Sequence, residues 1–319
     1  MQFHVYEITE DRYLRYVEAD SISPKWLTDD NHRWIDLTDF QKHDLEALLA
    51  PLDLNSEIMD ACLVQQSRPR VITLEQILFV SIPVQTDKDN LCYLTFLCDP
   101  TTIITIQHSE ILYLDDLASR CLHDRRLIAA NTAGLVFELV DTSLRKNSSL
   151  YFSLRDEVVA TAQMLEDDVS AIDIDVIMNL AREAVQLEIL FQDQQYCLSE
   201  LLNGRSESLA LETIRAALTS LVADIDRAQS AVSRLQGQIR DLHQYHLHNV
   251  DEATNRRLNM LTLLSAIYLP PTLLAGIYGM NFDNIPIVGM PYGYEIAMAL
   301  MITLVLGQLA FFRWRGWFQ

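Results

Sequence analysis

The chain has 319 residues, 50% of them hydrophobic, and a formal net charge of −20. This length allows one domain with its own core plus a small membrane part. So large a negative charge argues against binding nucleic acid, whose phosphates need basic partners, and it is compatible with attracting cations.

The negative charge is concentrated in the first four fifths of the chain. Residues 258–319 contain Asp283, Glu295, Arg313 and Arg315, which cancel, so residues 1–257 carry the whole excess. The five cysteines are scattered, odd in number and lack CxxC spacing, which predicts reduced thiols rather than disulfides or a zinc site. The N-terminus lacks the basic start and apolar run of a signal peptide, so we expect membrane insertion to depend on later segments.

Residues 1–130 alternate between strand and helix patterns, which predicts an α/β domain with a mixed sheet. Helices are expected at Phe40–Ala50 and from about Asn55 to Val64. Runs rich in β-branched and aromatic residues predict strands at Phe3–Ile8, Tyr13–Glu18, Arg33–Leu37, Val71–Leu74, Ile77–Val84, Leu91–Leu97 and Thr102–Gln107. The chain has no glycine-rich phosphate loop, Gly-x-Ser-x-Gly or metalloprotease motif, so we do not expect an enzyme.

The middle of the chain is expected to be helical. In residues 131–205 apolar side chains recur at spacings of three and four, with a turn near Asp173 and a stop at Gly204. A second such pattern, over residues 206–257, resembles a coiled-coil seam and contains no proline. We therefore predict a stalk helix of about 70 residues, roughly 105 Å long, that continues into the membrane.

Two apolar segments close the chain. The first, 258–281, includes about 21 uncharged residues from Leu258 to Tyr278, enough to cross a bilayer as a helix. A loop at 282–293, a second span at 294–312 and a basic tail at 313–319 follow. Arg256 and Arg257 precede the first span, Arg313 and Arg315 follow the second, and the loop between the spans has no Lys or Arg. This distribution of positive charge predicts that both termini are cytoplasmic.

The first span carries an unusual stripe of small, hydroxyl and leucine side chains at helical spacing. Its members are Asn255, Leu258, Thr262, Ser265, Leu269, Thr272 and Gly276, and we call this set the pore stripe. Two interpretations fit it. In the first, the small and hydroxyl residues of the stripe pack this helix against other helices in lipid. In the second, several copies of the stripe surround an ion path in which the leucines form dry constrictions.

The first span ends in Tyr278-Gly279-Met280-Asn281. This YGMNF motif, placed between two C-terminal spans after a long helix and an N-terminal mixed domain, resembles the CorA family of magnesium and divalent-cation channels. The resemblance covers the whole chain in order. It implies an α+β membrane protein with a cytoplasmic α/β domain, a helical middle, and a very long stalk helix that continues into the first of two transmembrane helices.

The resemblance also implies a function. It predicts a homopentamer in the bacterial inner membrane that admits Mg²⁺, with Co²⁺ and Ni²⁺ as further candidate ions. Gly279, Met280 and Asn281 would form the selectivity filter and the pore stripe the conduit. Mg²⁺ holds its water tightly, so a ring of amide oxygens would recognise the hydrated ion from outside.

In the family, cytoplasmic divalent cation closes the channel at carboxylates between subunits. The corresponding candidates are Asp87 and Asp89 of the sheet domain and Asp224 and Asp226 of the stalk.

Two alternatives remain open from the sequence. The outer loop contains Ile285-Pro286, as in the ZntB branch that is linked to zinc, and His243, His246 and His248 precede the first span. That combination is compatible with a Zn²⁺ transporter, including one coupled to protons. A protein of another class, a membrane-tethered coiled-coil scaffold without transport, has the same hydrophobic pattern.

Overall fold

The computed structural model describes residues 2–19, 21–22, 26, 30–87, 90–108, 111, 113–167, 172–204, 209–280 and 290–315, with the side chains of 85–87, 90 and 167 excepted. The described chain forms two compact units, residues 1–243 and 244–319. Helix α6 (Arg215–Tyr278) contributes to both.

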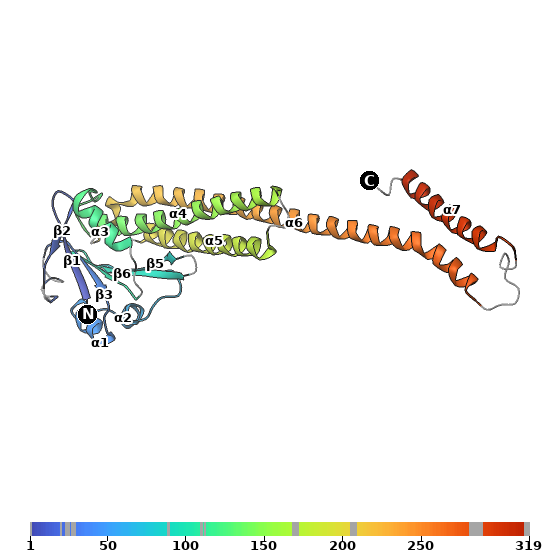
Figure 1. Cartoon of the computed structure of the whole chain (residues 1–319). Helices are drawn as coiled ribbons and strands as arrows, with labels where there is room; N and C mark the ends of the chain where they lie inside the picture. Colours follow the sequence, from blue (N-terminus) through green and yellow to red (C-terminus); the bar gives the residue numbers. More distant parts are fainter. Residues whose placement is uncertain are drawn as a thin grey trace. The chain divides into compact units, whose positions relative to one another are not determined.

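The first unit is built on a seven-stranded mixed sheet, as predicted (Figure 1). Its strands are β1 (Gln2–Ile8), β2 (Leu14–Val17), β3 (Arg33–Thr38), β4 (Arg70–Thr73), β5 (Leu78–Asp87), β6 (Asn90–Cys98) and β7 (Thr102–Ile106), in the order β2-β1-β3-β7-β6-β5-β4. Strands β3 and β7 pair parallel and the other neighbours pair antiparallel. Both faces of the central strands are apolar, so both need a covering layer.

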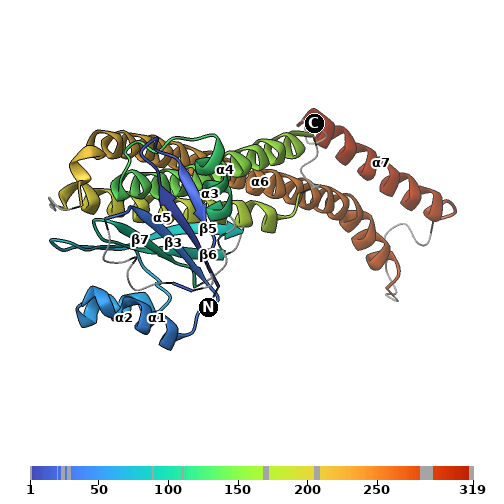
Figure 2. The same cartoon turned by 90° about the vertical axis from the view of Figure 1, so that its left-hand side faces the viewer.

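Each face of the sheet has its own core. On one face, α1 (Lys42–Leu49) and α2 (Ser56–Leu63) pack over a cluster that includes Ile35, Leu37 and Phe79 (Figure 2). On the other face, α3 (Tyr113–His123), α4 (Thr132–Asp167), α5 (Ile174–Asn203) and the first part of α6 enclose the larger core, which includes Trp34 and Phe96. All five cysteines are buried free thiols, as the sequence indicated.

The stalk helix begins later than the sequence suggested. Leu211–Thr213 forms a 3-10 turn after Ala210, whose φ of 50° lies in the left-handed region, and the continuous α-helix starts at Arg215. A left-handed alanine cannot lie inside an α-helix, which explains the break. Helix α6 then runs for 64 residues, through Pro270 and Pro271, to Tyr278.

The apolar seam of α6 packs within its own chain. The buried seam residues are Leu218, Leu221, Ile225, Val232, Leu235 and Ile239, and they join the same core as α4 and α5. Polar contacts flank the seam: the Gln236 amide donates to the carboxylate of Glu188 on α5 at 2.8 Å. The first half of α6 therefore packs on α4 and α5, which themselves cover the sheet.

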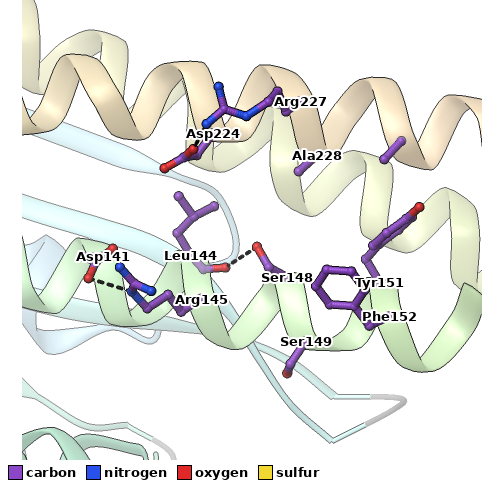
Figure 3. Close-up of a pocket in the computed structure, with 11 residues that line it drawn as sticks. Asp141, Leu144, Arg145, Ser148, Ser149, Tyr151, Phe152, Asp224, Arg227 and Ala228 are labelled. Carbon is purple, nitrogen blue, oxygen red and sulfur yellow. Dashed lines mark hydrogen bonds and ion pairs between the residues drawn. The ribbon is translucent and has the colours of Figure 1, made fainter.

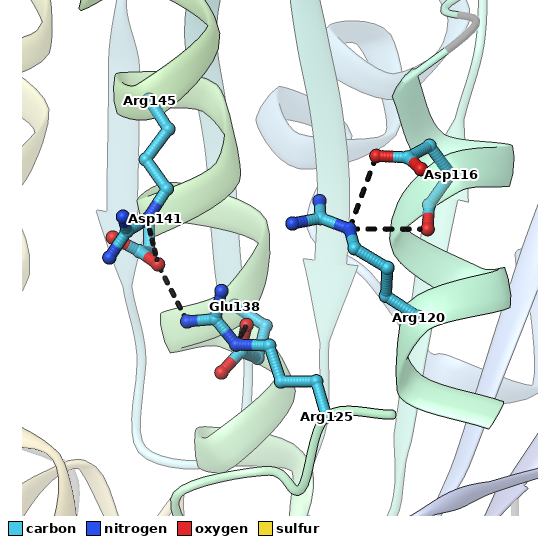
Figure 4. Close-up of polar contacts among 6 residues, drawn as sticks. All are labelled: Asp116, Arg120, Arg125, Glu138, Asp141 and Arg145. Carbon is cyan, nitrogen blue, oxygen red and sulfur yellow. Dashed lines mark hydrogen bonds and ion pairs between the residues drawn. The ribbon is translucent and has the colours of Figure 1, made fainter. Parts of the chain in front are cut away.

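An ion-pair network joins the α3–α4 connection to α4 (Figure 4). Arg125 Nε lies 2.9 Å from Glu138 Oε2, and Arg125 Nη2 lies 2.8 Å from Asp141 Oδ2. Arg145 Nε reaches the same Asp141 oxygen at 2.8 Å. Glu138 and Asp141 are each only 2% exposed, and burial raises the pKa of the Glu138 carboxyl. Arg125 and Arg145 therefore supply the positive charges that offset the burial of these two acidic side chains.

Candidate ion pathway

The second unit contains two helices that could cross a membrane. The C-terminal part of α6 and the whole of α7 (Gly293–Trp314) are long and apolar enough to cross a bilayer. No residue in the most apolar stretch of either helix is buried. Apolar helices exposed over this length need lipid or neighbouring chains to cover them.

One face of the α6 span packs against α7. Its half-buried residues recur at helical spacing and are Leu263, Ala266, Ile267, Pro270, Pro271, Leu274 and Tyr278. A matching half-buried stripe on α7 consists of Gly293, Ala297, Met301, Leu304, Val305, Gln308 and Phe312. Each span is therefore half-buried along one stripe, and a hydrogen bond from Gln308 to the Ala266 carbonyl joins the two stripes.

The pore stripe lies on a different side of α6. Every one of its members, from Asn255 to Gly276, is exposed, and Leu258 and Leu269 are 54% and 71% exposed. A Cβ added to Gly276 would meet nothing within 4 Å. Packing against α7 therefore does not account for the small and hydroxyl residues of this stripe.

The threonine hydroxyls of the pore stripe bond to their own helix. Thr262 Oγ1 donates to the Leu258 carbonyl at 2.8 Å, and Thr272 Oγ1 donates to the Tyr268 carbonyl at 2.7 Å. Each hydroxyl proton is thereby committed, while the oxygen keeps acceptor capacity on the exposed side. Water molecules that hydrate a cation direct their hydrogens outward, so acceptors are the groups that such an ion needs from a wall.

The end of the first span is tight. The Gly279 N–H donates to the Ala275 carbonyl at 2.9 Å, and the Met280 N–H donates to the Ile277 carbonyl at 3.3 Å. A Cβ on Gly279 would approach the Ala275 oxygen to 3.1 Å, closer than ordinary contact, which explains a glycine here. Asn281, the third predicted filter residue, lies outside the described residues.

The predicted regulatory carboxylates have other partners in the chain. Asp224 pairs with Arg227 at the edge of a groove of about 560 Å³ between α4 and α6 (Figure 3). Asp226 accepts from the Gln195 amide at 2.6 Å. Asp89 and the side chain of Asp87 lie outside the described residues. Within the described part of the chain, no three His, Cys, Asp or Glu side chains converge on a metal site, so the three stalk histidines do not form one.

Comparison with known proteins identifies the family. The family model of the CorA-like Mg²⁺ transporter protein matches residues 29–314. The cobalt/magnesium transport protein CorA of Thermotoga maritima is 22% identical over 325 aligned positions, which cover 98% of this chain and 90% of the relative. The solved CorA magnesium transporter of Methanocaldococcus jannaschii superposes with a TM-score of 0.81 at 20% identity, over 99% of each chain. The full-length CmaX protein gives a TM-score of 0.80 at 19% identity, over 97% of this chain and 96% of that one. The expected fold is confirmed, and the chain belongs to the CorA family of divalent-cation transporters.

Proposed function

We propose that this protein is a homopentameric channel that admits Mg²⁺ down its gradient. The observation that carries the proposal is the position of the pore stripe: all its residues are exposed on the side of α6 that α7 leaves uncovered. One stripe cannot enclose a path for an ion, so several copies must share an axis. Five copies is the number that the family resemblance implies.

The chemistry of the stripe suits a hydrated divalent cation. The hydroxyl oxygens of Thr262 and Thr272 present acceptors to the hydration shell, because their protons are committed to the helix. Between them lies Leu269, and rings of leucine at Leu258 and Leu269 gate the path by excluding water when they close. Mg²⁺ thereby crosses with its first shell intact, which avoids the cost of dehydration.

The filter at the entrance consists of Gly279, Met280 and Asn281. The tight backbone at Gly279 brings the chain close to the axis, and the Asn281 amide oxygens accept from the hydration shell. Truncation by Asn281→Ala is expected to abolish Mg²⁺ uptake while the pentamer, measured by light scattering in detergent, remains. Normal uptake by this variant would remove the role assigned to Asn281.

The orientation in the plasma membrane follows from charge. Arg256 and Arg257 precede the first span, and Arg313 and Arg315 follow the second, so both termini are cytoplasmic. The acidic first unit then lies in the cytosol.

Regulation uses the stalk carboxylates. Cytoplasmic Mg²⁺ competes for Asp224 and Asp226 with their partners Arg227 and Gln195, and a neighbouring subunit supplies Asp87 and Asp89. In Asp224→Asn with Asp226→Asn, internal Mg²⁺ should inhibit flux only at higher concentration. An unchanged inhibition curve would dissociate these residues from regulation.

A further inference from the structure

Two consecutive prolines lie inside the first span and remove two hydrogen-bond donors. In a regular helix the residue at 270 donates to the Ala266 carbonyl, and the residue at 271 donates to the Ile267 carbonyl. Pro270 and Pro271 have no N–H, yet α6 continues through them. In the hydrocarbon core no water replaces the missing donors, so an orphaned carbonyl there needs a partner from the protein.

The second span supplies that partner for Ala266. Gln308 Nε2 on α7 donates to the Ala266 carbonyl oxygen at 3.0 Å. This bond joins residues 42 positions apart and lies within the contact between the two half-buried stripes. The other amide atom, Gln308 Oε1, is buried and has no hydrogen-bond partner among the described residues. The hydrogen bond to Ala266 is therefore the interaction that offsets the burial of the Gln308 amide.

We propose that Gln308 is a positioning residue for the pore helix. Its amide replaces the N–H that Pro270 lacks, and it fixes the rotation of α6 against α7 at the point where the helix is weakest. That rotation keeps Ser265 and Leu269, which flank Ala266 and Pro270 in sequence, directed away from α7. This inference rests on the proposed function for its consequence in transport, whereas the bond itself is testable without transport.

The test is a double-mutant cycle on the full-length protein. Gln308→Met removes the donor and keeps the size of the side chain, while Pro270→Ala returns a backbone N–H to Ala266. Interhelical hydrogen bonds in membranes change an equilibrium by about 3- to 18-fold. We therefore expect Gln308→Met to lower the folded-to-unfolded ratio in detergent by that factor in the parent. In the Pro270→Ala background the same substitution should change the ratio less than two-fold.

A matched control lies on the same helix. Thr303 Oγ1 donates to the Ala299 carbonyl of α7 itself at 2.7 Å, so Thr303→Val should have the same effect with and without Pro270→Ala. If Gln308→Met prevents assembly, recovery of the pentamer on adding Pro270→Ala supports the inference and absence of recovery overturns it. Equal effects of Gln308→Met in both backgrounds would also overturn it.

A second readout reports the rotation of α6. Because the five native cysteines are buried, Ser265→Cys provides a single accessible thiol for a charged, membrane-impermeant reagent. Gln308→Met should slow its modification 3- to 18-fold, and Pro270→Ala should restore most of the rate. If Ser265→Cys never reacts while the stability cycle shows coupling, the proposed channel fails and the role of Gln308 in joining the helices stands. If it reacts at a rate that Gln308→Met leaves unchanged, the positioning role fails and the channel stands.

Discussion

Replacement of Arg125 by methionine tests how the cytosolic unit holds its buried charges. Arg125 contacts the carboxylates of Glu138 and Asp141 at 2.9 and 2.8 Å, and both of these residues are 2% exposed. Asp141 retains Arg145 in the variant, whereas the pairing that Arg125 gives Glu138 is lost. Removing one partner of a buried pair costs about 3–5 kcal/mol, because the remaining charge is left in a medium that solvates it poorly.

The lower end of that range applies to Arg125→Met. Burial already raises the pKa of Glu138, so the carboxyl can take up a proton when Arg125 is gone and part of the penalty is relieved. A loss of about 3 kcal/mol corresponds to a fall in Tm of about 6–12 °C for a unit of this size. Thermal unfolding of the purified protein, followed by circular dichroism at pH 7.5, measures it.

The neighbouring surface pair provides a matched control for this prediction. Arg120 Nε lies 3.1 Å from Asp116, whose side chain is 67% exposed, so Arg120→Met should cost less than about 1 kcal/mol. Adding Glu138→Gln to Arg125→Met should recover most of the lost Tm, because no unpaired charge then remains. A fall in Tm for Arg125→Met that matches that of Arg120→Met would refute the reasoning.

Three further predictions concern the same protein. Burial raises the pKa of the Glu138 carboxyl, so the native state holds this proton more tightly than the unfolded chain does. The stability of the parent relative to Glu138→Gln should therefore increase as pH falls from neutral towards the ordinary pKa of 4.5, and it should level off below that pH. A difference in Tm that stays constant across this pH range would contradict a raised pKa for Glu138. Leu269→Ser should raise Mg²⁺ flux at least several-fold by wetting the constriction, whereas Leu264→Ser, outside the pore stripe, should not; equal fluxes would count against a gate at Leu269. Thr262→Val should lower flux about five-fold, equivalent to about 1 kcal/mol for a lost acceptor, and an unchanged rate in a fluorescent-indicator assay would exclude this hydroxyl from the path.

The architecture was predictable because its determinants are local. Strands β1 to β7 follow runs of β-branched and aromatic residues, and the seam of α6 follows three-and-four spacing, so each element could be recognised from neighbouring residues. Helix α3 was not predicted. Its buried residues Leu114, Leu117 and Cys121 do carry a helical spacing, but the helix has only 11 residues, which is short for a pattern of this period. The start of α6 was placed too early because nothing local to Ala210 announces its left-handed backbone.

The residues of the candidate pathway were chosen from the sequence, and the contact that supports the first span was not. The pore stripe could be selected by composition and spacing, and its role as the wall of an ion path stays a prediction, because exposure on α6 is shared with many residues outside the stripe. The bond from Gln308 to Ala266 could not be found this way, because its partners lie 42 residues apart and only the docking of α7 on α6 brings them together. One signal was available in the sequence. A glutamine within an apolar span needs a polar partner, and a proline in the other span leaves a backbone carbonyl without its usual N–H donor.

The most direct test of a channel is flux through the purified protein in liposomes. With Mg²⁺ outside and an indicator inside, we predict entry of Mg²⁺ without a pH gradient, at rates that exceed those for Zn²⁺. Absence of Mg²⁺ entry would contradict the account and favour a scaffold, and entry of Zn²⁺ alone, driven by a pH gradient, would replace the magnesium channel with a proton-coupled zinc transporter.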